Sequence, residues 1–362
     1  MEVAPPDVAR RLSQGVRIQI FPRKKVQIVV PGFKTFPFSM RESWKTLFQK
    51  KAISFEWIVH QEGRPEKAAK KIQTEGIVLL LNDHHLDDLT GYLWDQGRFG
   101  RGRDGSLWVG LATEKVIGSI FPRSEEKTRL CARLCHLVAH FDPAAGRVIS
   151  SEGAIPLFCH QYADTESFRP QQQYSKKKDG IFWAGKLSVG DFAEAYSDRL
   201  QLFKKIKNST GFFWRKATNP EKKIWEVVKE KDCYKGLLNL PSNCPGFTSN
   251  FFENLAMGGC VLQHDVSSPH PEGLEPGVHY LTYCKNDPES LLEVSARFMA
   301  EPGRFQKMAE LGREACLRGH SLSIRAGQIF GALASQNNPR SDISKGAKDQ
   351  LCELVDKIKR PR

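Results

Sequence analysis

Residues 245–259 place glycines, hydroxyl and amide side chains and one carboxylate within a single loop and the helix that follows it. An apolar strand candidate, residues 236–240, precedes this stretch, and Cys260-Val261-Leu262 follows it directly as a second strand. A helix that begins at residues 248–250 between two parallel strands points its free N–H groups, and the positive end of its dipole, toward the carboxyl edge of the sheet. Phosphate groups bind readily at such a position. The stretch therefore predicts a phosphate site.

Glu253 lies one turn inside this helix, and its spacing permits two interpretations. A carboxylate there can bind a hydroxyl pair of a ribose or sugar while the helix N–H groups hold a diphosphate. Alternatively, Asn250 and Glu253 form a capping box, in which the N-cap side chain and the acid three residues later satisfy each other's backbone donors. Spacing alone leaves both interpretations open.

A second group of candidates lies in the first half of the chain, where polar or flexible residues follow apolar strand candidates. Open α/β sheets bind ligands at the carboxyl ends of their strands, so these residues are candidates for contact with a second substrate and for the catalytic base. The candidates are Asp83, His84, His85, Glu114, Lys34 and Gly32. Asp83 could instead cap a helix that starts near Leu86, the histidines could be ordinary packing residues, and Gly32 could serve a tight turn.

The elements that must position these residues alternate along the whole chain between apolar strands and amphipathic helices. Such alternation predicts an α/β protein with mostly parallel sheets, and 362 residues favour two domains. We predict a first domain over residues 1–168, a polar linker over 169–180, a second domain over 181–335, and a tail at 336–362 that contains an amphipathic helix. Within the first domain we expect a helix over residues 124–141 and a strand near 154–160.

Composition limits the functional classes. The formal net charge of +13 favours a polyanionic partner, which could be nucleic acid, anionic lipid or an acidic glycan, although a solvated surface explains any single basic cluster equally well. Nine scattered cysteines argue against a disulfide framework, and Cys131 and Cys135 are expected to be buried thiols. No apolar run is long enough to span a bilayer, and the first residues lack a signal-peptide core, so we expect a cytoplasmic protein.

The second half of the chain resembles the glycosyltransferases of GT-B fold, in particular the spore-maturation-type subgroup with a group-1-like C-terminal domain. Five segments in the order of that family carry the resemblance: residues 162–170 (YADTESFRP), 182–187 (FWAGKL), 246–259 (GFTSNFFENLAMGG), 275–281 (EPGVHYL) and 320–326 (HSLSIRA). The resemblance covers residues 155–335, and the first half matches in pattern only.

This resemblance implies two Rossmann-like domains that face each other across a cleft, with the C-terminal segment returning to the first domain. It implies transfer of a sugar from a nucleotide diphosphate-sugar, a co-substrate rather than a resident cofactor, to an acceptor hydroxyl. Glu253 would bind the ribose of the donor and Lys186 its diphosphate. The remaining donor-binding positions would be Gly246, Phe247, Thr248, Ser249 and Asn250. Many relatives carry a second glutamate eight positions before Glu253, where this chain has Pro245.

Two further expectations complete the interpretation. The chain has no Asp-x-Asp pair, the pattern that metal-using GT-A enzymes need, so a metal-independent reaction is expected in which helix N–H groups and a lysine stabilise the leaving diphosphate. The alternative to an enzyme is a basic nucleic-acid-binding or DNA-modifying protein on a GT-B scaffold. Association with a membrane surface is a further possibility that the charge raises.

The charge generates a first prediction. If the +13 serves attraction to an anionic acceptor or membrane surface, the protein will bind vesicles of anionic lipid at low ionic strength, and binding will weaken steeply with added salt. Cosedimentation with anionic and neutral vesicles between low and physiological salt measures this. Equal recovery with both vesicle types at every salt concentration would show that the charge only keeps the protein in solution.

Overall fold

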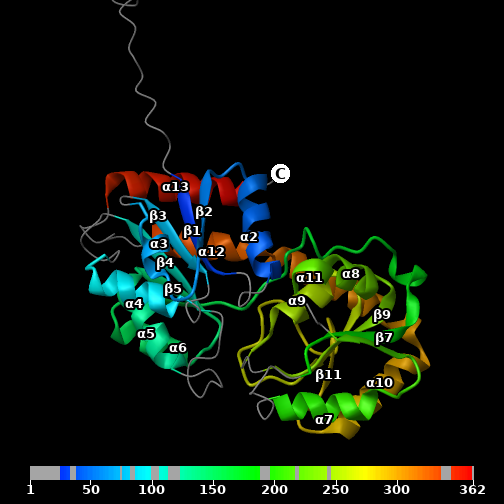
Figure 1. Cartoon of the computed structure of the whole chain (residues 1–362). Coiled ribbons are helices and arrows are strands. Elements are labelled where there is room, and N and C mark those ends of the chain that lie inside the picture. The colour runs from blue at the N-terminus through cyan, green and yellow to red at the C-terminus, as the bar shows by residue number, and fades with distance from the viewer. Residues whose placement is uncertain are drawn as a thin grey trace, which may run out of the picture.

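The computed structural model describes residues 25–32, 38–73, 76–81, 86–98, 106–112, 123–187, 196–216, 220–242, 246–335 and 344–360. Its strands form two separate sheets, one of six strands and one of five, and every strand pairing within them is parallel. Each sheet is covered by helices, which gives two α/β units (Figure 1). We refer to the unit built on strands β1–β6 as the first unit and to the unit built on β7–β11 as the second unit.

The six-stranded sheet of the first unit has the order β2-β1-β3-β4-β5-β6. Its strands are β1 (Val26–Pro31), β2 (Phe55–His60), β3 (Ile77–Leu81), β4 (Leu107–Ala112), β5 (Leu137–His140) and β6 (Ile155–Phe158). Its connecting helices are α2 (Phe38–Lys50), α3 (Pro65–Ala69), α4 (Asp87–Asp95), α5 (Ser124–Leu134) and α6 (Ala145–Ser151). The strands are continuous apolar runs because helices bury both faces of the sheet.

The five-stranded sheet of the second unit has the order β11-β10-β9-β7-β8. Its strands are β7 (Lys178–Gly185), β8 (Phe212–Lys216), β9 (Tyr234–Asn239), β10 (Cys260–His264) and β11 (Leu281–Tyr283). Its helices are α7 (Ser197–Ile206), α8 (Pro220–Asp232), α9 (Ser249–Ala256), α10 (Pro288–Ala300) and α11 (Gln306–Gly319). One core packs α8, α9 and part of α11 on one face of the sheet, and the other packs α7 and α10 on the opposite face.

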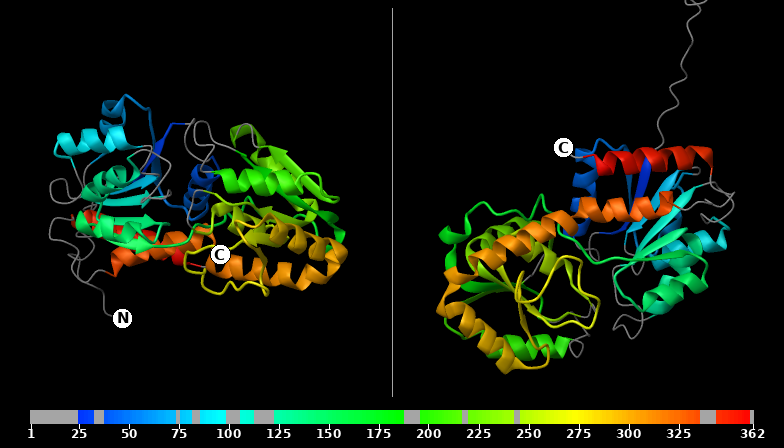
Figure 2. Two further views of the ribbon diagram at one scale, coloured as in Figure 1. Left: turned by 90° about the horizontal axis from the view of Figure 1, so that it is seen from below. Right: turned by 180° about the vertical axis from the view of Figure 1, so that it is seen from behind.

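The last two helices return to the first unit. Helix α12 (Leu322–Ala334) and α13 (Lys345–Lys359) contribute Ile329, Phe330 and Ile358 to the same core cluster as β1, β3 and α2. Figure 2 shows α12 continuing from α11 beneath the first unit, with α13 alongside it. The return therefore begins at Leu322, whereas the sequence assigned residues up to 335 to the second domain. The domain limits themselves remain a prediction.

The chain crosses between the units twice, and the two crossings are hydrogen-bonded to each other. The Ala163 N–H donates to the His320 carbonyl, and the Leu322 N–H donates to the Ala163 carbonyl, both at 3.0 Å. The Asp164 carboxylate closes a turn in the first crossing by accepting from the N–H groups of Glu166 and Ser167. The motif that resembled the family's crossing segment is thus a turn held by its aspartate.

Three expectations about local structure need correction or completion. Residues 124–141 are not one helix: α5 ends at Leu134 and β5 begins at Leu137, because the run Leu137–Ala139 is short, apolar and paired on both sides. Residues 178–180 belong to β7 and not to the linker. Cys131 and Cys135 are buried in the core of the first unit, as expected, with their sulfur atoms 3.9 Å apart.

The packing of α12 generates the second prediction. Ile329 is fully buried in the first core, whereas Ile324 on the same helix is 39% exposed. We expect Ile329→Ala to lower the free energy of unfolding by ~2–5 kcal/mol and Ile324→Ala by about 1 kcal/mol or less, because only the first creates a cavity. Denaturant titration monitored by circular dichroism measures both. Equal losses for the two variants would contradict the placement of α12 in this core.

Candidate active site

Helix α9 and the loop before it lie where the sequence predicted a phosphate site. Thr248 is the N-cap residue, with φ −79° and ψ 164°, and its side chain makes no capping bond. Gly246 is a point of close approach: a Cβ there would lie 3.1 Å from Ser268 Oγ and 3.8 Å from the Phe141 carbonyl oxygen of the first unit. The loop therefore lies at the seam between the two units, with the N-terminus of α9 directed toward it.

Glu253 is buried against Lys231 of α8. Its Oε2 lies 3.3 Å from Lys231 Nζ, which also donates to Asn250 Oδ1 at 2.7 Å. The two charged side chains are 13% and 4% exposed, respectively. Burial raises the pKa of the Glu253 carboxyl and lowers that of Lys231, while their mutual attraction opposes both shifts. Within the described part of the chain Glu253 Oε1 has no hydrogen-bond partner.

These contacts contradict the capping-box interpretation. Thr248, and not Asn250, is the N-cap residue, and Asn250 lies inside the helix. The Asn250 side chain accepts from Lys231 and donates through Nδ2 to Asn239 Oδ1 at 2.8 Å, so it joins α8, α9 and β9. The carboxylate of Glu253 thus pairs with an ammonium group, and one of its two oxygens is left for another partner.

A chain of amide side chains continues from Asn250 along the carboxyl edge of the sheet. Asn239 Nδ2 donates to Gln263 Oε1 at 2.6 Å, and Gln263 Nε2 donates to the His264 carbonyl at 2.8 Å. The Tyr283 hydroxyl donates to the Asn239 carbonyl at 2.7 Å. These bonds satisfy the buried amides and fix the ends of β9, β10 and β11 relative to α9.

Lys186 follows β7 at this same edge. Its side chain is exposed, and among the described residues its ammonium group forms no ion pair. Its carbonyl accepts from Arg199 Nη1 at 2.7 Å, and Arg199 Nε donates to the Pro241 carbonyl after β9. Burial lowers the pKa of the Arg199 guanidinium. Arg199 therefore holds two adjacent loops together, and Lys186 presents an exposed positive charge beside them.

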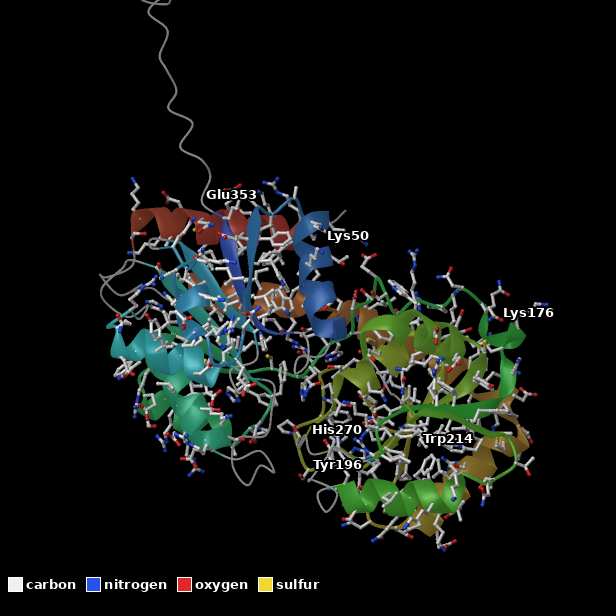
Figure 3. All side chains as sticks on the ribbon, in the orientation of Figure 1. Lys50, Lys176, Tyr196, Trp214, His270 and Glu353 are labelled. Atoms are coloured by element: carbon white, nitrogen blue, oxygen red, sulfur yellow. The ribbon has the colours of Figure 1, made fainter. Side chains whose placement is uncertain are left out.

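Histidines of the crossings contact aromatic side chains of the α9 loop and helix, and two further histidines lie at the end of β5 and on the loop after β10. The His160 ring lies 6.1 Å from that of Phe247, and the His320 ring stacks on Phe252 at 5.0 Å. His140, at the end of β5, is bound through Nδ1 to the Asp142 carbonyl at 2.8 Å. His270 projects from the loop after β10, with its ring 5.5 Å from Phe247 (Figure 3).

Burial keeps the imidazoles of His140, His160 and His320 neutral near pH 7. It lowers the pKa of His160 and of His320 to about 4 each, with the positive charge of Arg325 adding to the effect, and it also lowers the pKa of His140. A neutral imidazole carries one acceptor nitrogen, which can receive a hydroxyl proton. The seam thus combines helix N–H groups and the exposed ammonium group of Lys186 on one side with the neutral imidazole of His160 on the other.

The structure brings together all the donor-site residues predicted after residue 245. Gly246 and Phe247 belong to the loop, and Thr248, Ser249, Asn250 and Glu253 belong to the cap and first turns of α9. Phe247 is 2% exposed among other aromatic rings, so its side chain belongs to the core. Gly32 lies at the end of β1, where a Cβ would come 3.2 Å from the His60 carbonyl oxygen. Asp83, His84, His85, Glu114 and Lys34 lie outside the described residues.

Lys231, Arg199, His140 and His160 were not predicted from the sequence. Reading residues 124–141 as one helix hid the end of β5, and with it His140. The apolar run Leu137–Ala139, followed by a histidine and an aspartate, was a usable signal for a strand end. Lys231 and Arg199 are ordinary cations on amphipathic helices, and no local pattern distinguishes them from solvated residues.

Comparisons with known proteins agree with this geometry. Residues 202–331 match the family described as glycosyl transferase-like. Similar solved structures include Anabaena HepE in complex with UDP-glucose, with a TM-score of 0.61, 11% identity and coverage of 86% of this chain and 99% of that one. Sucrose-phosphate synthase from Thermosynechococcus elongatus has a TM-score of 0.58 and 12% identity, and the match covers 85% of this chain and 99% of that one. A glycosyltransferase from Rickettsia africae has a TM-score of 0.54 and 10% identity, with coverage of 86% of this chain and 97% of that one. No curated protein sequence matches the chain.

The chain has the GT-B fold. The family match spans α7 to α12 and includes α9 and Glu253. The expected α/β class with two Rossmann-like units is confirmed, whereas the spore-maturation-type subgroup remains a prediction. Among the described helices, none is long and apolar enough to cross a membrane.

The buried pair generates the third prediction. Lys231→Met leaves the Glu253 carboxylate buried without its ammonium partner and should lower the free energy of unfolding by ~3–5 kcal/mol at pH 7. The pKa of Glu253 should rise further, so the folded state will bind a proton that the unfolded state does not, and the loss should shrink as pH falls through that raised pKa. Denaturant titrations at several pH values measure this.

The double variant Lys231→Met/Glu253→Gln is the matched control for this experiment. It removes both charges and should recover much of the lost stability at pH 7. The free energy of unfolding of Lys231→Met could instead stay low both at acid pH and in the double variant. That result would show that the two side chains are not coupled.

Proposed function

We propose that this protein transfers a glycosyl group from a nucleoside diphosphate-sugar to an acceptor hydroxyl, without a metal ion. The second unit binds the donor, and the first unit and the crossings bind the acceptor. The observation that carries the proposal is the state of Glu253: its carboxylate is paired with Lys231 through one oxygen, and the other oxygen has no partner among the described residues. Glu253 belongs to the helix whose N-terminus follows the glycine loop.

The donor side follows from three groups at one edge of the sheet. Glu253 Oε1 can accept from a ribose hydroxyl pair, because a charge-assisted hydrogen bond to an ionised carboxylate is strong. The backbone N–H groups of Ser249 and Asn250 and the positive end of the α9 dipole suit the diphosphate. Lys186, exposed after β7, adds a mobile positive charge.

Glycosyl transfer develops negative charge on the departing diphosphate and positive charge on the sugar. Preorganised N–H groups and an ammonium group stabilise the leaving group because they require no reorganisation when the charge develops. Lys231 does not take this role, since it is buried and already shared between Asn250 and Glu253. We assign it to positioning of Glu253, and assign leaving-group stabilisation to Lys186 and the first turn of α9.

On the acceptor side we propose His160 as the group that receives the acceptor hydroxyl proton. It is partly exposed, it is neutral because burial lowers its pKa to about 4, and its ring lies next to the α9 loop. Its low pKa makes it a weak base, which suits a hydrogen-bond acceptor that takes the proton late in the transfer. His140 is buried in the first unit, at 2% exposure, and its Nδ1 is hydrogen-bonded to the Asp142 carbonyl just after β5.

We further propose a UDP-sugar as donor, since HepE of similar fold is described in complex with UDP-glucose. For the acceptor we propose an anionic glycan or lipid, which the net charge of +13 would attract; association with a membrane surface belongs to the same proposal. The GT-B fold and the family match favour transfer over a nucleic-acid-binding role.

The fourth prediction concerns Glu253. Glu253→Gln keeps the shape of the side chain but removes the charge-assisted bonds to ribose, each worth ~1.5–3 kcal/mol, so the Kd for UDP-glucose should rise at least about tenfold. The substitution also leaves Lys231 buried without a counter-charge, so the melting temperature should fall as well. Isothermal titration calorimetry and thermal unfolding of the same preparations measure the two effects.

Glu293→Gln is the matched control, because it removes one exposed carboxylate from α10 of the same unit. It should leave both the affinity and the melting temperature unchanged. If the folded Glu253→Gln protein binds UDP-glucose as tightly as the parent, Glu253 does not bind the donor. If the parent binds no UDP-, GDP-, ADP- or CMP-sugar, the proposed function itself is wrong.

A further inference from the structure

The first N–H group of α9 is already occupied by a side chain from the first crossing. Gln161 Oε1 accepts from the Ser249 backbone N–H and from the Ser249 hydroxyl, both at 2.6 Å. These residues are 88 positions apart in the chain, and Gln161 is 9% exposed. Because the Thr248 side chain makes no capping bond, Gln161 supplies the cap from outside the helix.

The neutral carboxamide oxygen of Gln161 lies at the N-terminus of α9, where an anionic oxygen would bind more strongly. The helix dipole and the free N–H groups attract negative charge more strongly than a neutral amide. A phosphate oxygen can therefore replace Gln161 Oε1 at the same two donors and gain charge-assisted hydrogen bonds. The exchange leaves no donor of Ser249 without a partner.

A second observation indicates that the loop is completed by a ligand. The Ser268 hydroxyl is buried, at 7% exposure, and has no hydrogen-bond partner in the part of the chain that the structure describes. It faces Gly246, whose missing side chain lets it approach the loop backbone. An orphaned buried hydroxyl costs free energy, and a bound oxygen-rich group beside the loop would satisfy it.

The backbone around Gln161 is held in place, so its side chain can leave without movement of the crossing. Tyr162 Oη accepts from Trp44 Nε1 of α2 at 2.9 Å, and Ala163 is bonded to His320 and Leu322. The Gln161 carbonyl accepts from Arg325 Nη2 at 3.4 Å. Rotation about the side-chain bonds of Gln161 is then the motion that frees Ser249.

We propose that Gln161 is a displaceable occupant of the donor-phosphate site, which caps Ser249 in the free protein and yields to a phosphate oxygen of the donor. This inference rests on the proposed function, because it takes the N-terminus of α9 as the diphosphate site. Gln161 thereby sets the affinity for ligands that carry a phosphate group, and it does not affect the affinity for neutral nucleosides. It is a positioning residue, next to His160 in sequence, and no proton or covalent step is assigned to it.

The fifth prediction compares two substitutions with opposite effects on the Kd for UDP and UDP-glucose, measured by isothermal titration calorimetry. Gln161→Ala removes the competitor, so the Kd should fall by about fivefold or more, corresponding to the loss of two hydrogen bonds that binding must otherwise break. Gln161→Glu replaces a neutral occupant by a carboxylate, so the Kd should rise at neutral pH and recover as the carboxylate is protonated in acid. The melting temperature of Gln161→Ala should fall, because α9 loses its cap.

A control variant, a ligand without phosphate and the binding of the parent protein distinguish this proposal from its alternatives. Gln173→Ala, a change of the same type at an exposed position, should alter neither affinity nor melting temperature. Uridine, which carries no phosphate, should bind Gln161→Ala and the parent equally well. A purely structural cap predicts that Gln161→Ala loses donor affinity together with stability, and that result would overturn the proposal, as would equal affinities in all variants. Failure of the parent to bind any nucleotide would instead refute the proposed function.

Discussion

The buried ion pair of Lys231 and Glu253 is the interaction on which the carboxyl edge of the second unit's sheet depends. An ion pair in a protein core gains little net stability, because desolvation of both charges offsets their attraction. It does, however, make alternative arrangements costly, since moving either partner leaves a buried charge alone. Through Asn250 and Asn239 this constraint extends from α8 to α9 and β9. The depth and rotation of α9 are thereby fixed, and with them the direction of its N–H groups.

The two units are joined by hydrogen bonds of the crossings and by ring contacts such as that of His160 with Phe247. Arg325 lies in this junction at 4% exposure and contacts Gln161, Gln328 and His320. On the first-unit side, Lys50 at the end of α2 (Figure 3) pairs with Glu166 of the turn that Asp164 closes. Directional bonds of this kind define the relative position of the groups that they join.

Much of the fold could be predicted from the sequence because its elements carry strong local patterns. The apolar runs of β1 and β3 and the amphipathic stripe of α13 specify their own conformations. Helix α9 was also located correctly, since a Pro/Gly loop precedes it and Gly258, at φ 63°, ends it. The strand β5 was missed because four residues are too few to show a period, and because the helical pattern of α5 runs almost up to it.

By itself the sequence determined the alternation of strands and helices, the glycine loop and the place of Glu253 within α9. Only the tertiary structure decided what Glu253 does there: its partner, Lys231, is a surface-type residue that packing buries, and spacing had favoured a capping box with Asn250 equally well. The same holds for Gln161, which reaches Ser249 across 88 positions, and for α12, whose apolar face could have packed on either unit. The physical reason is that hydrophobic periodicity and the conformational preferences of turn residues depend on near neighbours in the chain. Contacts between distant charged and amide side chains depend instead on which surfaces the whole fold brings together and removes from water.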